Sequence, residues 1–180
     1  MLSLFARAYN TPAASMLPNL LIGDHFWAWH GYYRKHAPAR GEIALFLHGD
    51  SVFIKRVIGL PGDTIAMKAG RLWINGAEVE RQEDGTEADA EFGGTFKRYR
   101  ETLPGGASHV ILELDDTSML DEVPPIQVPP DSYFVMGDNR DNSNDSRVPA
   151  FGTVPKEMFT DRPFLIYFSP TLSRIGSRIN

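Results

Sequence analysis

The sequence predicts an all-β fold, with mixed antiparallel sheets in a partly open, barrel-like core and a smaller β subdomain inserted into that core. Short runs of β-branched and aromatic residues recur along the chain, and turns rich in glycine, proline or asparagine separate them. Only residues 156–160, after Pro155, have a helical pattern. The chain has 180 residues, of which 42% are hydrophobic, and this is enough for one sizeable domain with an appendage.

The first half of the chain alternates strand signals with turns. The Gly-Leu-Pro-Gly-Asp turn at residues 59–63 ends an apolar strand, because its glycines tolerate positive φ and its proline fixes φ. Asn75-Gly76 predicts a type I′ hairpin. We expect strands at residues 26–29, 41–47, 51–58, 64–67 and 71–74.

The composition changes between residues 78 and 121, where charges are dense and glycine pairs punctuate the chain. This change predicts an inserted subdomain at residues 78–121, whose residues 95–103 and 108–114 are expected to form a hairpin. Residues 1–77 and 122–170 are then expected to form the core, with later strands at 133–136 and 164–168. Residues 171–180 are predicted to be a tail, and the chain is basic and expected to fray from Ser169 onward.

Composition and charge exclude several classes of protein. The net charge of −5 and the absence of a basic stripe argue against nucleic-acid binding. Without cysteine the chain has no disulfide, thiolate metal site or cysteine nucleophile. No run of about 18 apolar residues is present, so the chain as given does not span a membrane. Residues 1–8 are too short for a signal peptide, and they are compatible with a native start or with the remainder of a removed segment.

Lys55 lies in the middle of the strand predicted at residues 51–58, where a lysine is costly. Its ammonium must either reach a surface or lose its hydration, and in the second case its pKa falls. The strand alone favours the first interpretation, with Lys55 and Arg56 as charges on a water-facing edge. Ser15 lies between Pro12 and Pro18, which place it in an extended or turning segment rather than inside a helix.

Residues 137–147 form a run of eleven polar residues and glycines. A calcium loop is excluded, because Ser146 stands where that loop requires glycine and Gly152 where it requires glutamate. Two interpretations stay open. The run is either a solvated surface loop, or a hydrogen-bonded polar network packed behind a reactive site.

The residues that could act as nucleophile and base leave one chemistry open. The five histidines lie in no recognisable motif, have no metal-ligand spacing, and accompany no Gly-x-Ser-x-Gly elbow. A serine activated by a neutral lysine is the alternative. The histidines are His25, His30, His36, His48 and His109.

Four stretches resemble, in the same order, the sequence boxes of type I signal peptidases, also called leader peptidases. They are Ser-Met-Leu-Pro-Asn-Leu at residues 15–20, Gly23-Asp24, Lys-Arg-Val-Ile-Gly-Leu-Pro-Gly-Asp at residues 55–63, and residues 137–147 with the Phe-Gly-x-Val-Pro that follows at 151–155. Together they cover the predicted core but not residues 78–121. Agreement of several independent motifs in order makes a chance match improbable.

The resemblance implies a Ser-Lys dyad, in which Ser15 is the nucleophile and Lys55 the general base. No metal or organic cofactor is implied. The lysine must then be largely neutral, and lowering its pKa from ~10.4 to about 8 means disfavouring the ammonium by roughly 3 kcal/mol. Ser143 resembles the serine that orients the lysine amine, and Asp145 and Arg147 resemble its supporting ion pair, with Arg56 nearby.

Two positions depart from the family pattern. Ala13 stands where the family often has a serine whose hydroxyl helps to bind the oxyanion, so the backbone N–H of Ser15, a nearby group or water would have to replace it. Asn19 stands where the family has threonine, and we expect it to keep the polarity and little more.

The family cleaves after small residues at the first and third positions before the scissile bond. An extended substrate that adds to a sheet edge fits this preference. For each candidate substrate-binding residue, plain core packing is an equal alternative. The candidates are Met16, Leu20, Phe53 and Ile54 for an apolar pocket, and Tyr9 to Thr11 for pairing with the substrate.

The predicted function is a serine endopeptidase that removes signal peptides from exported pre-proteins. Its expected place is the bacterial inner membrane, with the catalytic domain on the outer, periplasmic face. Trp27 and Trp29 lie on one side of a strand and predict contact with the membrane surface. The alternatives are a specialised pilin or conjugation maturation peptidase, and an inactive family member that acts as a peptide-binding module. A self-cleaving repressor is disfavoured, because no DNA-binding domain precedes the catalytic part.

Overall fold

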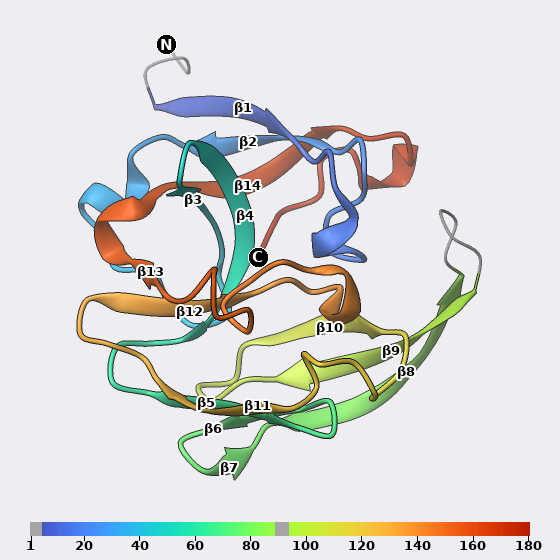
Figure 1. Ribbon diagram of the computed structural model, residues 1–180. Helices are drawn as coiled ribbons and strands as arrows, with labels where there is room; N and C mark the ends of the chain where they lie inside the picture. Colours follow the sequence, from blue (N-terminus) through green and yellow to red (C-terminus); the bar gives the residue numbers. More distant parts are fainter. Residues whose placement is uncertain (1–4, 89–93) are drawn as a thin grey trace.

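The computed structural model describes residues 5–88 and 94–180 (Figure 1). Residues 1–4, half of the segment judged too short for a signal peptide, lie outside the described residues. The chain is mostly β, which confirms the predicted fold class. All strand pairs are antiparallel, and within the described residues none of the sheets closes into a barrel.

The largest sheet has seven strands in the order β1-β2-β14-β3-β4-β12-β13. Figure 1 shows β1, β2 and β14 at one end of the molecule, away from the four-stranded sheet at the other end. The strands are β1 (Ala6–Asn10), β2 (His25–Trp29), β14 (Phe159–Phe168), β3 (Ile43–His48), β4 (Ser51–Gly59), β12 (Ser132–Met136) and β13 (Val154–Pro155).

Two smaller sheets complete the fold. One has four strands in the order β11-β5-β6-β7, and the other has three in the order β10-β9-β8. Their strands are β11 (Val123–Gln127), β5 (Thr64–Lys68), β6 (Arg71–Ile74), β7 (Ala77–Glu78), β10 (Ser108–Glu113), β9 (Thr95–Thr102) and β8 (Glu80–Ala88). Short 3-10 helices are η2 (Ala14–Met16), η3 (Tyr32–Arg34), η4 (Arg140–Asn142), η5 (Lys156–Met158) and η6 (Leu172–Arg174).

Strand β4 is an interior strand, so the interpretation of Lys55 and Arg56 as edge charges is wrong. β3 pairs with it on one side, where Ala44 faces Lys55, and β12 pairs on the other, where Met136 faces Arg56. Both basic side chains are only 3% exposed. The nearly continuous apolar run of this strand is typical of a strand buried on both faces.

Several expected elements have the predicted ends, and others differ for physical reasons. Asn75 and Gly76 both have positive φ, of 54° and 81°, which confirms the type I′ hairpin between β6 and β7. The helical expectation for residues 156–160 holds only for η5, because β14 begins at Phe159. β14 continues through Pro163, which the sheet accommodates beside a register shift between Pro163 and Leu165.

The chain after Ser169 is packed rather than frayed, which corrects that expectation. Arg174 donates to the buried Asp24 carboxylate at 2.7 Å, and Arg178 forms a bridge with Leu165. Ile179 is buried in the same apolar cluster as Met16. Long-range contacts therefore hold a segment whose composition alone suggests mobility.

The three-stranded sheet lies wholly within residues 78–121, and the division into core and insert stays a prediction. Val79 and Leu103 from this region share an apolar cluster with Ile58 and Phe134 of the large sheet. Across the described part of the chain, no helix has the length and apolarity needed to cross a membrane.

Candidate active site

Ser15 is the middle residue of the short helix η2; it is half-buried and lines a surface cleft. The preceding Ala13 is extended, with φ −129° and ψ 156°, as Pro12 and its neighbours predict. The segment is thus a single 3-10 turn, consistent with the expected turning segment. Lys55 Nζ, from the middle of β4, donates a hydrogen bond to Ser15 Oγ at 2.6 Å.

Burial lowers the pKa of the Lys55 amine from its ordinary 10.5 to about 8. The loss of hydration is the largest cause, and the Asp145 and Asp138 carboxylates partly oppose it by favouring the ammonium. The guanidinium of Arg147 acts in the same direction as burial. A substantial fraction of the amine is therefore neutral near pH 8, as a general base at this position requires.

The cleft beside Ser15 has a volume of about 320 Å³. Phe53 and Ile54 line it, as expected for an apolar pocket. The sequence analysis did not assign the remaining lining residues. Only their closeness in the sequence to motif positions could have indicated them. These are Pro12, Ala14, Val52, Asn142 and Asn144.

Met16 and Leu20 do not line the cleft, so core packing rather than substrate contact describes them. Both have 0% exposure and lie in an apolar cluster with Phe26. Their spacing from Ser15 could not distinguish the two possibilities, because core and pocket residues are equally apolar.

Tyr9 lies on β1, which is the edge strand of the large sheet and pairs only with β2 among the described strands. Its hydroxyl donates to Asp161 at 2.6 Å. The backbone of Thr11 is already bonded to Gly23 and Asp24. The free edge for an added strand is therefore that of β1 rather than the chain at Thr11.

The polar loop at residues 137–147 is a buried network, so the solvated-loop interpretation is wrong. Arg147 forms a fork with Asp145, at 2.9 Å for both Nε and Nη2, and the Gly137 N–H donates to the same carboxylate at 3.0 Å. Burial alone would raise the pKa of Asp145, but Arg147 and these donors hold it below its usual value. The predicted Asp145–Arg147 ion pair is thus present in the structure.

Ser143 is buried beside this network and close to Ser15. A Cβ on Gly137 would lie 2.5 Å from the carbonyl oxygen of Ser15 and would overlap Ser143 Oγ, so this corner has no free space. The Ser143 hydroxyl has no hydrogen-bond partner among the described residues. The hydrogen bond expected between Ser143 and the lysine amine is therefore not made in this structure.

Arg56 belongs to a second ion pair, separate from Asp145 and Arg147. Its guanidinium forms a fork with Asp138, with both nitrogen–oxygen distances 2.8 Å, and its Nη1 donates to the Gly41 carbonyl at 2.6 Å. The sequence analysis missed Asp138 as a partner, because the two residues are 82 positions apart. The only signal in the sequence was the position of Asp138 near the start of the polar loop.

Asn139 joins the polar loop to the segment that carries Ser15. Its N–H donates to the Ser15 carbonyl at 3.1 Å, and its side-chain amide donates to the Ala14 carbonyl at 3.3 Å. The sequence analysis did not assign this residue. These bonds fix the backbone on which the Ser15 hydroxyl is carried.

Ala13 is exposed and has no side-chain donor, as its sequence requires. The N–H of Ser15 is one of the groups that the start of a 3-10 helix leaves without an intrahelical acceptor. It is therefore a backbone hydrogen-bond donor beside Ser15 Oγ.

A serine hydroxyl hydrogen-bonded to a buried lysine amine, in an apolar cleft on a β scaffold, is typical of hydrolases that work through acyl transfer. The sequence profile of the family described as "Signal peptidase, peptidase S26" matches residues 1–168. The chain belongs to this family.

Three relatives described as signal peptidase I agree with this assignment by sequence. A signal peptidase I of Rickettsia conorii is 31% identical over 94% of this chain and 74% of its own length. One from Rickettsia prowazekii is 37% identical over 86% of this chain, and one from Rickettsia massiliae is 39% identical over 76%. The chain spans only 61% and 54% of these two relatives. A signal peptidase I structure from Enterococcus faecalis V583 has a TM-score of 0.41 and 26% identity, covering 69% of this chain and 94% of its own.

Gly137→Ala is predicted to disturb Ser15 and Ser143, because the added Cβ has no room. We expect a loss of about 1–3 kcal/mol of unfolding free energy, as for other overpacked sites, measured by urea denaturation. We also expect Ser15 to react about 100-fold more slowly with a p-nitrophenyl ester. Gly59→Ala is the matched control, since its Cβ would lie 2.9 Å from Ile65 and Phe134, away from Ser15. Equal ester reactivity in the two variants would contradict the prediction.

The burial of Lys55 makes the unfolding free energy depend on pH in a defined window. Its pKa is about 8 when folded and near 10.5 when unfolded, so the unfolded chain binds more protons between these values. The contribution of Lys55 to stability therefore rises with pH across this window, and below pH 8 the buried ammonium costs about 3 kcal/mol. Lys55→Met should be more stable than the wild type by up to about 3 kcal/mol at pH 7, with the gain vanishing near pH 10.5.

Urea denaturation at a series of pH values measures this difference. Lys68→Met, at an exposed lysine of β5, controls for adding an apolar side chain to a strand. A stability gain for Lys55→Met that stays constant across the window would show that the lysine is not desolvated in the folded chain.

Proposed function

We propose that the chain is a serine endopeptidase that cleaves signal peptides from exported pre-proteins, with Ser15 as nucleophile and Lys55 as general base. The observation that carries this proposal is the 2.6 Å hydrogen bond between Lys55 Nζ and Ser15 Oγ, combined with the burial of the lysine. Family membership and the signal peptidase I relatives support the substrate class.

The proposed reaction proceeds by acyl transfer. Neutral Lys55 accepts the proton of the Ser15 hydroxyl as Oγ attacks the scissile carbonyl carbon, and a tetrahedral oxyanion forms. Lys55 then gives this proton to the departing amine as the C–N bond breaks, which leaves an acyl group on Ser15. A water molecule, deprotonated by Lys55, attacks the ester carbonyl carbon. The C–Oγ bond then breaks, Lys55 returns the proton to Ser15 Oγ, and the acyl group leaves as a carboxylic acid.

Oxyanion stabilisation is proposed to rest on the backbone N–H of Ser15. Ala13 supplies no hydroxyl, and loss of one oxyanion donor typically lowers the rate by on the order of 10²-fold. The Asn142 and Asn144 side chains line the same cleft and have amide donors. The chain is therefore proposed to be an active enzyme whose chemical step relies on few donors.

The geometry of the site supports an extended substrate. The free edge of β1 offers backbone groups to a peptide that adds as a strand, and Phe53 and Ile54 line the apolar pocket beside Ser15. Phe53 and Ile54 are proposed to limit the size of the side chain before the scissile bond.

The deciding experiment is cleavage of a pre-protein with alanine at both specificity positions, in detergent. We expect processing by the wild type, and rates at least about 1000-fold lower for Ser15→Ala and Lys55→Ala, because each removes a partner of the dyad. The kcat/KM of the wild type should rise with pH along a limb with a pKa near 8, since only the neutral amine accepts the proton.

Ser173→Ala and Lys35→Ala, both at exposed positions, are the matched controls and should cleave at the wild-type rate. Cleavage by Lys55→Ala would refute the base assignment and return the histidines as candidates. An inert but folded wild type would favour the peptide-binding module. Cleavage confined to one pilin-like or conjugation substrate in a broad panel would favour the specialised maturation peptidase.

We further propose that an aromatic patch on β2 and β14 of the seven-stranded sheet contacts the membrane surface, in keeping with a periplasmic, membrane-attached site of action. Trp27 and Trp29 are 37% and 39% exposed, whereas Phe26 and Ala28 between and beside them are buried. Trp29 stacks on Phe164, and Trp27 packs against Tyr167 of β14. Exposed aromatic side chains of this kind favour the interface of a bilayer.

The double substitution Trp27→Ala/Trp29→Ala tests this contact. We expect its co-sedimentation with phosphatidylethanolamine/phosphatidylglycerol liposomes to fall about 10-fold or more, because two large apolar surfaces leave the interface. Trp73→Ala, on the four-stranded sheet, is the matched control for losing an indole. Unchanged binding of the double variant would remove the membrane hypothesis.

A further inference from the structure

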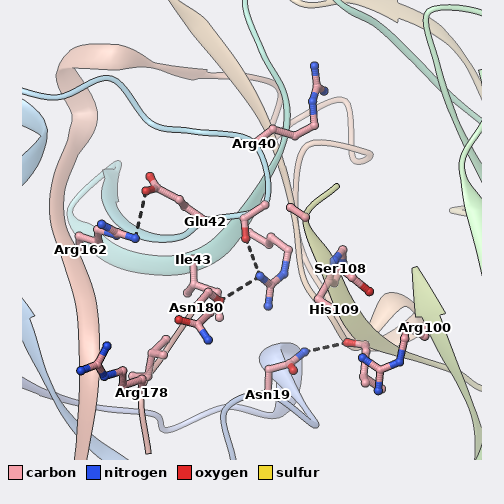
Figure 2. A pocket seen from close by; sticks show the side chains of 15 residues that line it. Asn19, Arg40, Glu42, Ile43, Arg100, Ser108, His109, Arg162, Arg178 and Asn180 are labelled. Atoms are coloured by element: carbon pink, nitrogen blue, oxygen red, sulfur yellow. Dashed lines mark hydrogen bonds and ion pairs between the residues drawn. The ribbon is translucent and has the colours of Figure 1, made fainter. Parts of the chain in front are cut away.

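Asn19 makes contacts that its position in the sequence did not predict. Its side-chain Nδ2 donates to the carbonyl of Val110 on β10 and to the carboxylate of Asp138, both at 2.7 Å. Figure 2 shows the hydrogen bond from Asn19 toward the strand that carries Ser108 and His109, which is β10. The expectation that Asn19 keeps polarity and little more is thus corrected. A threonine hydroxyl has one proton and could serve only one of these two acceptors.

These bonds close a circuit around the nucleophile. Asn19 is four positions after Ser15, and it ties that segment to β10 and to Asp138. The Asp138 carbonyl accepts the N–H of Leu112, also on β10, at 2.9 Å. The next residue, Asn139, donates back to the Ser15 carbonyl at 3.1 Å. The nucleophile segment, β10 and the polar loop therefore hold one another in place.

A second connection from the same sheet leads to the Arg147–Asp145 ion pair near Lys55. Glu101 of β9 is 1% exposed and forms a fork with Arg140, at 3.1 and 2.5 Å. Burial alone would raise the pKa of Glu101, but Arg140 holds it below its usual value. The Arg140 carbonyl accepts Arg147 Nη2 at 2.6 Å, and Arg147 pairs with Asp145.

His109 fills the space between the two connections. It lies opposite Glu101 across the β9–β10 pair, with Nε2 3.5 Å from the Glu101 carboxylate and 3.8 Å from that of Asp138. Burial, with a smaller effect from Arg56, lowers the pKa of His109 to about 4, so the ring is neutral at pH 7. Both carboxylates are therefore neutralised by arginines and not by this histidine.

We propose that the three-stranded sheet β8–β10 positions the dyad, with Asn19 and Glu101 as the positioning residues that link it to Ser15 and Lys55. The sequence analysis assigned residues 78–121 only a passive role. The inference rests on the proposed function for its rate effects, but its geometry does not. Neither residue touches the cleft, so both act through the backbone and ion pairs that hold the dyad.

The variants Asn19→Leu and Asn19→Thr test the first connection, and Glu101→Gln tests the second. We expect Asn19→Leu to lower kcat about 10- to 100-fold with KM within about threefold, since sub-ångström shifts of reacting groups are costly and the cleft is unchanged. Asn19→Thr, with one donor, should lie between Asn19→Leu and the wild type. Glu80→Gln, at an exposed residue of β8, is the control and should match the wild type.

A second measurement keeps this test separate from the signal peptidase proposal. The acylation of Ser15 by a p-nitrophenyl ester releases one nitrophenolate per serine and needs no signal peptide. We expect acylation to be slowest for Asn19→Leu, intermediate for Asn19→Thr and fastest for the wild type. The rates are measured at a temperature where circular dichroism shows that each variant is folded. If Glu101→Gln does not fold, the two Asn19 variants decide. Acylation by folded Asn19→Leu within about threefold of the wild type would overturn the proposal, whether or not any pre-protein is cleaved.

Discussion

The rest of the structure depends on keeping one amine neutral beside one hydroxyl. Lys55 must lose its hydration for its pKa to reach about 8. This requires that the lysine lie on an interior strand and that another segment cover it. The same burial strengthens the effect of any nearby carboxylate on the pKa of Lys55, because an unpaired negative charge would favour the ammonium. Asp145 and Asp138 both act in that direction, and each is held in a two-bonded fork by its own arginine. The paired charges let a polar loop cover the lysine without restoring its proton.

Strand geometry explains why two such ion pairs are needed. Successive side chains of a strand point to opposite faces, so Lys55 and Arg56 cannot share one environment. Lys55 faces the nucleophile segment, whereas Arg56 is buried against Asp138 and the Gly41 carbonyl. A buried arginine without a partner would be strongly destabilising, and Asp138 at the start of the polar loop supplies that partner. One loop thus serves both faces of β4.

Local patterns in the sequence predicted the elements but not their long-range partners. The apolar runs and the Asn75-Gly76 turn gave the strands, because burial and turn geometry are properties of a few neighbouring residues. The highly charged β8 was not expected as a strand, since it is held by pairing with β9, including an Arg98–Glu87 contact, rather than by its own propensity. Only the resemblance to family motifs predicted that Ser15 and Lys55 lie together. No local signal could show that Asn19 meets Val110, or that Met16 faces the core.

The two departures from the family pattern, at Ala13 and Asn19, have linked consequences. In the proposed mechanism, which lacks a hydroxyl at position 13, oxyanion stabilisation rests on the backbone N–H of Ser15, and such a bond weakens steeply with distance and angle. The orientation of that N–H is set by the peptide groups around Ser15, which Asn139 holds from one side. Asn19 holds the same segment from the other side, with a second donor that a threonine lacks. Under the proposed mechanism, a nucleophile with fewer side-chain donors gains most from a rigid backbone, and the sheet β8–β10 is the element proposed to provide it.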